Sequence, residues 1–354
     1  MWVGFNPNKD KNLVRSDYYH KIIIPVYIPN FEGYFKDSFR IFKICLESLY
    51  KTIHQHTYIS IATNGCCDEV IEFVNYEYNS GRIHEVVHNK ENIGKINSVL
   101  KSLSGTNETL ITITDADVLF CQGWQESTYE VFSVFSKAGV VSTSPGSKSY
   151  GKYDAIFYWD YFFSKRLRFT NVKDPEALIS FARSIGNEAM YNQVHLSKYL
   201  TLTNKGIVAV AGAAHFVATY KGEIFNHFKN KFSEYSLGGN SESLFLDTPA
   251  LKQGFYRLST SSNFTYHMGN VYENWMQEKL NQLENRKCSL VEQKKYLKIR
   301  GNSFKFFFFN KVYSKILLKR KVLLYVLIWK GLTRKEAKEY LTWSLFYTLI
   351  ATEI

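Results

Sequence analysis

Short runs of apolar and β-branched residues alternate with helical patterns over the first third of the chain, and this alternation constrains the fold most. Four of these runs are typical of buried strands, and they cover residues 21–27, 58–63, 83–87 and 109–114. Helical patterns lie between them, at residues 35–49, 70–78 and 96–103. Because strands that alternate with helices at this spacing form βαβ units, we predict an α/β fold with a mostly parallel central sheet flanked by helices.

Two carboxylates directly follow the fourth predicted strand, in the sequence Thr114-Asp115-Ala116-Asp117. Ligands of parallel sheets bind beyond the carboxyl ends of the strands. Carboxylates at positions i and i+2 can turn toward one point there and hold Mg²⁺ or Mn²⁺, with ligand positions left open for phosphate oxygens. The alternative is a helix cap or a solvated turn. We therefore predict a divalent metal at Asp115 and Asp117, where it would neutralise the charge on a departing diphosphate.

Four short motifs follow one another in an order that is typical of one enzyme family. They are the proline-containing strand at residues 21–27, Asn64-Gly65-Cys66-Cys67-Asp68, Asn92-Ile93-Gly94-Lys95, and Asp115-Ala116-Asp117. Over roughly residues 20–125 the chain resembles the nucleotide-sugar half of family 2 glycosyltransferases, which have the Rossmann-like GT-A fold. The resemblance implies a donor site whose nucleotide-sugar-binding residues are Pro25, Tyr27, Asn64, Asp68, Asn92, Lys95, Asp115 and Ala116.

The chain departs from the family pattern at two places. Asn64 stands where the family often has an aspartate, so that a contact with the base would be made by an amide. The family's N-x-G-x-x-x-A-x-N pattern has Ser98 and Leu100 at its last two positions here. A solvated surface lysine is therefore the alternative to a phosphate contact for Lys95.

The segment of residues 238–254, GGNSESLFLDTPALKQG, resembles the part of the family that supplies the catalytic base. By this resemblance we expect Asp247 to be the base, with Glu242 as the second candidate. A base is needed because the acceptor hydroxyl loses its proton as it attacks the anomeric carbon, and a single displacement inverts the configuration there. Asp247 can equally be a helix N-cap, because Asp ahead of Thr248-Pro249 is a common start signal.

Three further features of the sequence bear on the site. His267 follows a strand-like run, and family members often place a histidine here as a further metal ligand or diphosphate contact. An ordinary packed or surface histidine is the alternative. Trp124 and residues 211–214 are candidates for the acceptor site, and for Trp124 a role in the core is the alternative.

The net charge of +12 is concentrated at the C-terminal end of the chain. Residues 287–354 contain 15 Lys and Arg and four acidic residues, and so carry eleven of the twelve net charges. Aromatic and aliphatic residues are interleaved there with Lys and Arg, as in a helix that lies in an anionic lipid surface. The alternative is that these helices pack on the catalytic domain with their charges in water. Nucleic acid is a less favoured partner, because no nucleic-acid-binding module is recognisable.

Cysteine usage and hydropathy bear on the compartment. The five cysteines include no C-x-x-C pair, so that neither a disulfide framework nor a zinc site is indicated and a reducing cytosol fits. Residues 1–17 are polar and contain no apolar signal-peptide core. The apolar runs at residues 322–329 and 341–351 are too short to span a bilayer. We expect a cytoplasmic protein that is peripheral at the inner face of the cell membrane.

We expect two parts, a GT-A glycosyltransferase domain at residues 15–270 and a basic amphipathic helical tail at residues 271–354. The irregular, aromatic pattern of residues 146–205 favours a loop with helices inside the first part. The expected reaction is an inverting transfer from a nucleotide-diphosphate-sugar to a hydroxyl of a glycan or lipid-linked acceptor, as in bacterial surface polysaccharide synthesis, with Mn²⁺ or Mg²⁺ as cofactor. The alternatives are a nucleotidyltransferase, which usually needs a glycine-rich phosphate loop after the first strand, and a catalytically inert membrane-associated scaffold of the same fold.

Overall fold

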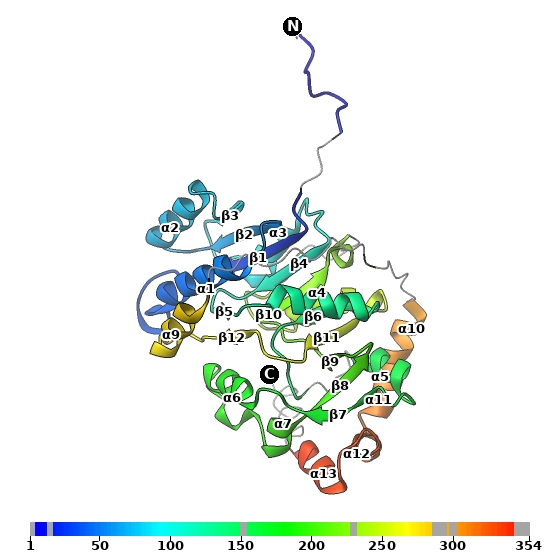
Figure 1. The fold of residues 1–354 in the computed structure, drawn as a ribbon. Helices are drawn as coiled ribbons and strands as arrows, with labels where there is room; N and C mark the ends of the chain where they lie inside the picture. Colours follow the sequence, from blue (N-terminus) through cyan, green and yellow to red (C-terminus); the bar gives the residue numbers. More distant parts are fainter. Residues whose placement is uncertain are drawn as a thin grey trace.

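The computed structural model of this chain describes residues 4–12, 17–148, 154–226, 232–284, 296 and 303–342. At its centre lies a mixed β-sheet, which has ten strands within these residues (Figure 1). In spatial order the strands are β3 (Glu85–Asn89), β2 (Thr57–Asn64), β1 (His20–Val26), β4 (Leu110–Thr114), β10 (Val217–Lys221), β6 (Ala138–Ser142), β11 (Tyr256–Thr260), β9 (Ile207–Ala211), β8 (Lys198–Asn204) and β7 (Leu167–Asn171). A small second sheet pairs β5 (Val118–Phe120) with β12 (Thr265–His267).

The four strands predicted from the apolar runs are parallel neighbours, in the order β3-β2-β1-β4. The helices between them along the chain are α1 (Ser38–Thr52), α2 (Asp68–Asn79) and α3 (Lys95–Leu103). Successive residues of β1 point to opposite faces of the sheet, so that Ile22 and Ile24 share a core with α1 while Ile23 shares one with α3. Because helices cover both faces, residues 22–26 of this strand are all apolar rather than alternating.

The other half of the sheet mixes strand directions. β10 is antiparallel to both of its neighbours, and β9, β8 and β7 form an antiparallel meander beside β11. Seven of the ten strands nevertheless point in one direction, and the prediction of an α/β fold with a mainly parallel central sheet is confirmed.

The meander overturns part of the prediction for residues 146–205, because β7 and β8 lie in this segment beside its helices. The turn from β8 to β9 gives the reason for one reversal. Lys205 and Gly206 have φ angles of 48° and 82°, and positive φ at both central residues is what a two-residue hairpin turn requires.

Helices cover both faces of the sheet. α3 and α8 (Thr248–Lys252) pack on one face, and α1 and α4 (Trp124–Val134) pack on the other. The remaining helical segments before residue 270 are η1 (Gly33–Phe35), α5 (Ala155–Tyr161), α6 (Pro175–Ser184), η3 (Glu188–Met190), α7 (Gln193–Ser197), η4 (Gly222–Phe225) and η5 (Ser243–Asp247).

Beyond residue 270 the described chain forms α9 (Asn274–Gln282), α10 (Ser303–Phe307), η6 (Phe308–Tyr313), α11 (Ser314–Leu317), α12 (Arg320–Trp329) and α13 (Arg334–Thr342). α9 packs against α1. The later helices bury Phe309, Leu317, Leu327 and Tyr340 in one core with strands β6 to β9. One side of the helical extension therefore packs on the sheet, and the division at residue 270 stays a prediction. No helix in the described part of the chain is long and apolar enough to cross a bilayer.

Candidate active site

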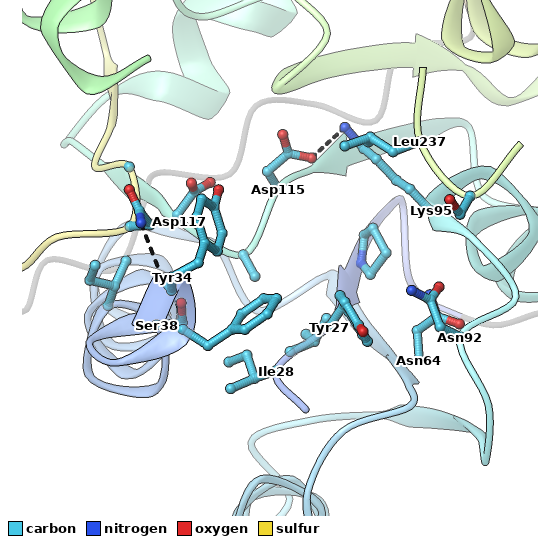
Figure 2. A pocket seen from close by; sticks show the side chains of 18 residues that line it. Tyr27, Ile28, Tyr34, Ser38, Asn64, Asn92, Lys95, Asp115, Asp117 and Leu237 are labelled. Carbon is cyan, nitrogen blue, oxygen red and sulfur yellow. Dashed lines mark hydrogen bonds and ion pairs between the residues drawn. The ribbon is translucent and has the colours of Figure 1, made fainter. Parts of the chain in front are cut away.

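The carboxyl ends of β1, β2 and β4 open into a cavity of about 450 Å³, which we call the first cavity (Figure 2). Its walls include seven of the eight residues predicted to bind the nucleotide-sugar, which are Pro25, Tyr27, Asn64, Asn92, Lys95, Asp115 and Ala116. The eighth, Asp68, is exposed in the first turn of α2 and is not among the residues that line this cavity. Asp117 also lines the first cavity.

Two amides fix the loop that forms one wall of the first cavity. Asn64 Nδ2 donates to Asn92 Oδ1 over 2.8 Å, and Asn64 Oδ1 accepts from the backbone N–H of Ile93 over 2.9 Å. Asn92 Oδ1 also accepts from the N–H of Gly94. One N–H and one lone pair of the Asn64 amide are thus used within the protein, and a contact with a base would use the second N–H or the second lone pair of the oxygen.

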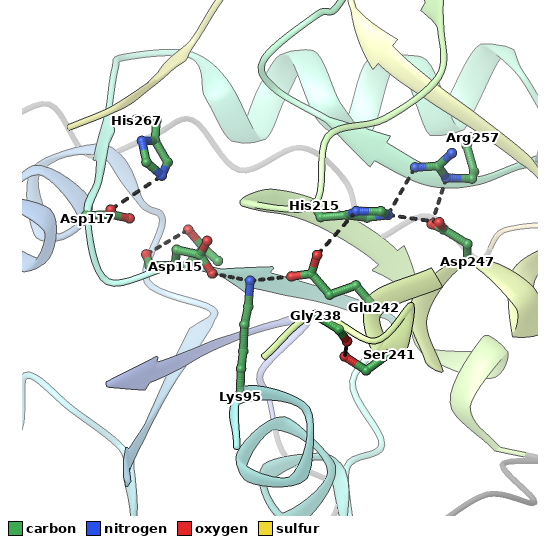
Figure 3. Close-up of polar contacts among 11 residues, drawn as sticks. Lys95, Asp115, Asp117, His215, Gly238, Ser241, Glu242, Asp247, Arg257 and His267 are labelled. Atoms are coloured by element: carbon green, nitrogen blue, oxygen red, sulfur yellow. Dashed lines mark hydrogen bonds and ion pairs between the residues drawn. The ribbon is translucent and has the colours of Figure 1, made fainter. Parts of the chain in front are cut away.

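Lys95 lies between two carboxylates, as Figure 3 shows. Its Nζ is 2.6 Å from Asp115 Oδ1 and 2.6 Å from Glu242 Oε1. Burial alone would lower the pKa of Lys95, but the charges of Asp115 and Glu242 outweigh it and raise that pKa. The side chain is only 16% exposed, which rules out the alternative of a solvated surface lysine.

Asp115, Asp117 and His267 form a cluster that could hold a divalent cation. One ligand atom of each lies within 4.8 Å of the others. Asp117 Oδ1 is buried and has no hydrogen-bond partner within the described residues, and such a group costs free energy unless a ligand satisfies it. Burial is also the largest influence on the pKa of Asp117, which it raises to about 6, and the neighbouring Asp115 adds to this while His267 opposes it.

The hydrogen bonds of His267 indicate which ring nitrogen faces the cluster. Ser184 Oγ donates its one proton to the carbonyl of Phe181, so it accepts from His267 Nδ1, which lies 2.9 Å away. In the neutral ring Nε2 then carries a lone pair, and it lies 3.4 Å from Asp117 Oδ2. Two acceptors that face each other at this distance are compatible with a cation between them. The cluster therefore fits Mn²⁺ or Mg²⁺, with Ser184 orienting the histidine ligand.

A second cavity, of about 490 Å³, adjoins the first. Asp115 lines both cavities, and residues 211–214 line the second one, where the sequence led us to expect the acceptor. Asp154 also lines the second cavity, and burial raises the pKa of its carboxyl to about 7. Trp124 lies in the core instead, where its indole N–H donates to Thr52 Oγ1, so the core alternative holds for this residue.

The two candidate bases differ in access to the second cavity. Glu242 lines it, whereas Asp247 is fully buried. Asp247 Oδ2 is 2.8 Å from His215 Nε2, and its Oδ1 is 2.8 Å from Arg257 Nε (Figure 3). The Asp247 side chain makes no capping hydrogen bond to α8, so the N-cap alternative is not supported by a contact.

His215 and Arg257 are residues that sequence reasoning missed. His215 Nδ1 lies 3.5 Å from Glu242 Oε2, so the imidazole separates Glu242 from Asp247. The available signal was a single histidine at the end of the small-residue run of residues 207–214, just before β10. A polar residue at such a strand boundary is a site candidate in an α/β fold.

Comparison with known proteins gives the following likenesses. No protein-family model matches this chain, and no curated protein matches it in sequence. Among solved structures, the mannosyltransferase PcManGT from Pyrobaculum calidifontis, in complex with GDP-Man and Mn²⁺, is similar at 12% identity and a TM-score of 0.43, over 98% of this chain and 83% of that one.

TarS from S. aureus is similar at 10% identity and a TM-score of 0.41, over 89% of this chain, which spans 50% of that protein's length. TarS 1–349 in complex with UDP-GlcNAc is similar at 11% identity and a TM-score of 0.42, over 76% of this chain and 68% of that one. Likenesses with TM-scores below 0.5 and identities near 10% carry no argument about function. We therefore infer the function from the geometry of the two cavities.

Proposed function

We propose that this chain is a metal-dependent glycosyltransferase with the GT-A fold, which moves a sugar from a nucleotide-diphosphate-sugar to a hydroxyl of a glycan or lipid-linked acceptor. One observation carries the proposal: the cluster of Asp115, Asp117 and His267 lies where the first and second cavities adjoin. A metal at this point would lie between a donor in one cavity and an acceptor in the other. The resemblance of residues 20–125 adds the context of bacterial surface polysaccharide synthesis.

The first cavity supports the donor half of the proposal. Its volume of about 450 Å³ is within the range of small-molecule sites. Tyr27, which is 42% exposed at its wall, offers a ring on which a base can stack. Lys95 is placed to contact the diphosphate, because its ammonium group already lies beside Asp115. Asp115, Asp117 and His267 would hold the divalent ion, which when bound would supply a Lewis acid for the leaving diphosphate.

The second cavity supports the acceptor half. Of the two candidate bases, Glu242 is the one that lines this cavity, and we assign it the role of the base, in place of the buried Asp247. Burial would raise the pKa of Glu242, but Lys95 and then His215 outweigh it and lower that pKa. A Lys95 side chain that moves toward a bound diphosphate would release Glu242 and make it a stronger base. Attack from this side, opposite the donor, would invert the anomeric configuration.

The test is binding of a panel of nucleoside diphosphates, measured by thermal shift with and without Mn²⁺. We expect one nucleotide to raise the melting temperature of the wild type only when Mn²⁺ is present, and Asp117→Asn to abolish this increase. Asp68→Asn is the matched control, because Asp68 is exposed and does not line the first cavity, and it should behave as the wild type. A folded wild type that no nucleotide stabilises would contradict the proposal and favour the inert scaffold.

A further inference from the structure

The helical segment formed by α10, η6 and α11 is apolar on the side that faces away from the protein. Its inner side packs Phe309 and Leu317 into the core. Its outer side carries Phe304, Phe308, Val312 and Ile316 at intervals of four residues, with exposed fractions between 38% and 76%. A helix that only covers a domain has polar residues on its outer side, so this apolar stripe points to a partner.

Aromatic residues from an earlier part of the chain extend this stripe. The ring of Trp159 in α5 lies 5.4 Å from Phe309 and 5.2 Å from Tyr313. Just after α5, Phe163 is 82% exposed, and its ring lies 5.8 Å from that of Trp329 in α12. Figure 1 shows α5 beside α11, with α12 next to them. The exposed members of this set make up what we call the aromatic face, which consists of Trp159, Phe163, Phe304, Phe308, Val312, Ile316 and Trp329.

A buried lysine joins the end of α12 to the end of α5. Lys330 follows α12, is 4% exposed, and donates from its Nζ to the carbonyls of Tyr161, Phe162 and Ser164 at 3.1, 2.6 and 3.2 Å. These carbonyls lie at the C-terminal end of α5, where a cation is favourable. The relative position of α5 and α12 is therefore fixed by contacts within the protein.

The surroundings of the aromatic face are cationic. Exposed basic residues in the segments that carry the aromatic face include Lys165, Arg166, Lys311, Lys315, Lys319, Arg320 and Lys321. The exposed acid beside Trp159, Asp160, is paired with Lys137. Residues 303–342 contain ten Lys and Arg and only two acidic residues, Glu336 and Glu339. An apolar surface with a positive rim is complementary to a bilayer that carries anionic head groups.

We propose that this chain docks on an anionic lipid bilayer through the aromatic face, with its aromatic and aliphatic side chains at the level of the acyl boundary and the surrounding Lys and Arg on the lipid head groups. A nucleic acid would also attract the cations and stack on the rings. Val312 and Ile316 favour lipid, because aliphatic side chains gain from contact with acyl chains and offer no ring to a base.

The aromatic face is one short helix away from the second cavity. Asp154, which lines that cavity, directly precedes α5, and Trp159 lies near the other end of this helix. With a rise of about 1.5 Å per residue, α5 spans about 10 Å. An acceptor that is held in the bilayer surface would thus lie close to the second cavity. The docking itself does not depend on the proposed transferase activity.

The test is co-sedimentation of the full chain with vesicles of phosphatidylcholine alone and of phosphatidylcholine with phosphatidylglycerol. We expect binding to the anionic vesicles that is at least about tenfold tighter than to the neutral ones and that weakens in about 0.5 M salt. The double variant Val312→Ser/Ile316→Ser should bind anionic vesicles about tenfold more weakly. Its control is Tyr76→Ser, which removes a 66% exposed aromatic residue from α2 and should change nothing.

A second pair of variants tests the charges. Lys315→Glu should weaken binding to anionic vesicles about tenfold, whereas Lys90→Glu, at an exposed position outside the aromatic face, should have little effect. Equal binding to both kinds of vesicle, no binding at all, or equal loss in test and control variants would overturn the proposal. A competition experiment with single-stranded DNA could also overturn it. If the DNA displaces the chain from vesicles, and if its binding weakens as much in the Val312→Ser/Ile316→Ser variant, the aromatic face binds nucleic acid instead. Unchanged melting temperatures establish that the variants are folded.

Discussion

His215 and Asp247 are joined by a contact of 2.8 Å between Nε2 and Oδ2, and the carboxylate is fully buried behind the imidazole. In the function that we propose, Asp247 orients His215 and does not contact the acceptor. We predict that His215→Gln lowers kcat about a hundredfold and leaves the KM for the donor nearly unchanged, because the imidazole positions Glu242 and does not line the first cavity. Steady-state kinetics checks this, with His88→Gln as the control at an exposed histidine. A raised donor KM at unchanged kcat would contradict the assignment.

Lys95 should matter for donor affinity more than for folding. Lys95→Met removes a cation that lies 2.6 Å from Asp115 Oδ1 and that we propose contacts the diphosphate. Because a charge-assisted hydrogen bond contributes about 1.5–3 kcal/mol, we expect nucleoside diphosphate binding in Mn²⁺ to weaken about ten- to a hundredfold. Isothermal titration calorimetry measures this. Lys101→Met, at an exposed lysine of the same helix, is the control, and equal affinities in the two variants would exclude Lys95 from the donor site.

Gly94 has no room for a side chain. Its φ is 87°, and an added Cβ would lie 2.9 Å from Ser236 Cα and 2.9 Å from the Tyr235 carbonyl oxygen. We predict that Gly94→Ala destabilises the protein by about 1–2 kcal/mol for the left-handed backbone and about 1–3 kcal/mol more for the overlap. Urea denaturation checks the value.

Gly105→Ala provides the comparison, since Gly105 has a φ of 73° but no atom of the described residues lies within 4 Å of an added Cβ. The free energy of unfolding of Gly105→Ala should therefore fall only by the contribution of the backbone conformation. Nucleotide binding should fall in Gly94→Ala and not in Gly105→Ala, because Ser236 lines the first cavity. Equal destabilisation in the two variants would mean that the loop around Tyr235 can move away from the added Cβ without a loss of stability.

A buried histidine should make stability depend on pH. His54 Nε2 lies 2.8 Å from the Tyr129 hydroxyl, and burial lowers the pKa of His54 to about 4, with His56 adding to this. The unfolded chain keeps a pKa of about 6.5, so between about pH 6.5 and about pH 4 the unfolded state binds a proton that the folded state does not. Stability contributed by the neutral ring is therefore present above this window and lost as the pH falls through it, by on the order of 1–3 kcal/mol.

Urea midpoints measured from about pH 7 to about pH 4.5 check this prediction. His54→Gln should lose less stability over the window than the wild type does, because glutamine does not titrate there. His88→Gln, at an exposed histidine, should follow the wild type. If the His54→Gln profile is as steep as that of the wild type, the loss comes from other groups.

The periodicity of apolar side chains is what the sequence by itself provides, and it determines the individual strands and helices. The residues of β1, β2, β3 and β4 form apolar runs separated by helical patterns, and this fixes each element because the period of side chains is a local property. The same runs predicted that Asp115 and Asp117 follow a strand, and therefore that they lie at the edge of the sheet where ligands bind. Seven of the eight predicted donor residues came together for this reason.

Strand order decided the rest of the site. The insertion of β10 antiparallel to β4 brings Phe216 to Asp115, whose N–H donates to the Phe216 carbonyl over 2.8 Å. His215 enters the site through this pairing, and the local sequence shows only that a histidine lies just before a strand. Lys95 and Glu242 are 147 residues apart in the chain and 2.6 Å apart in space. Such contacts depend on the packing of whole elements, which also buried Asp247 and left Glu242 at the second cavity.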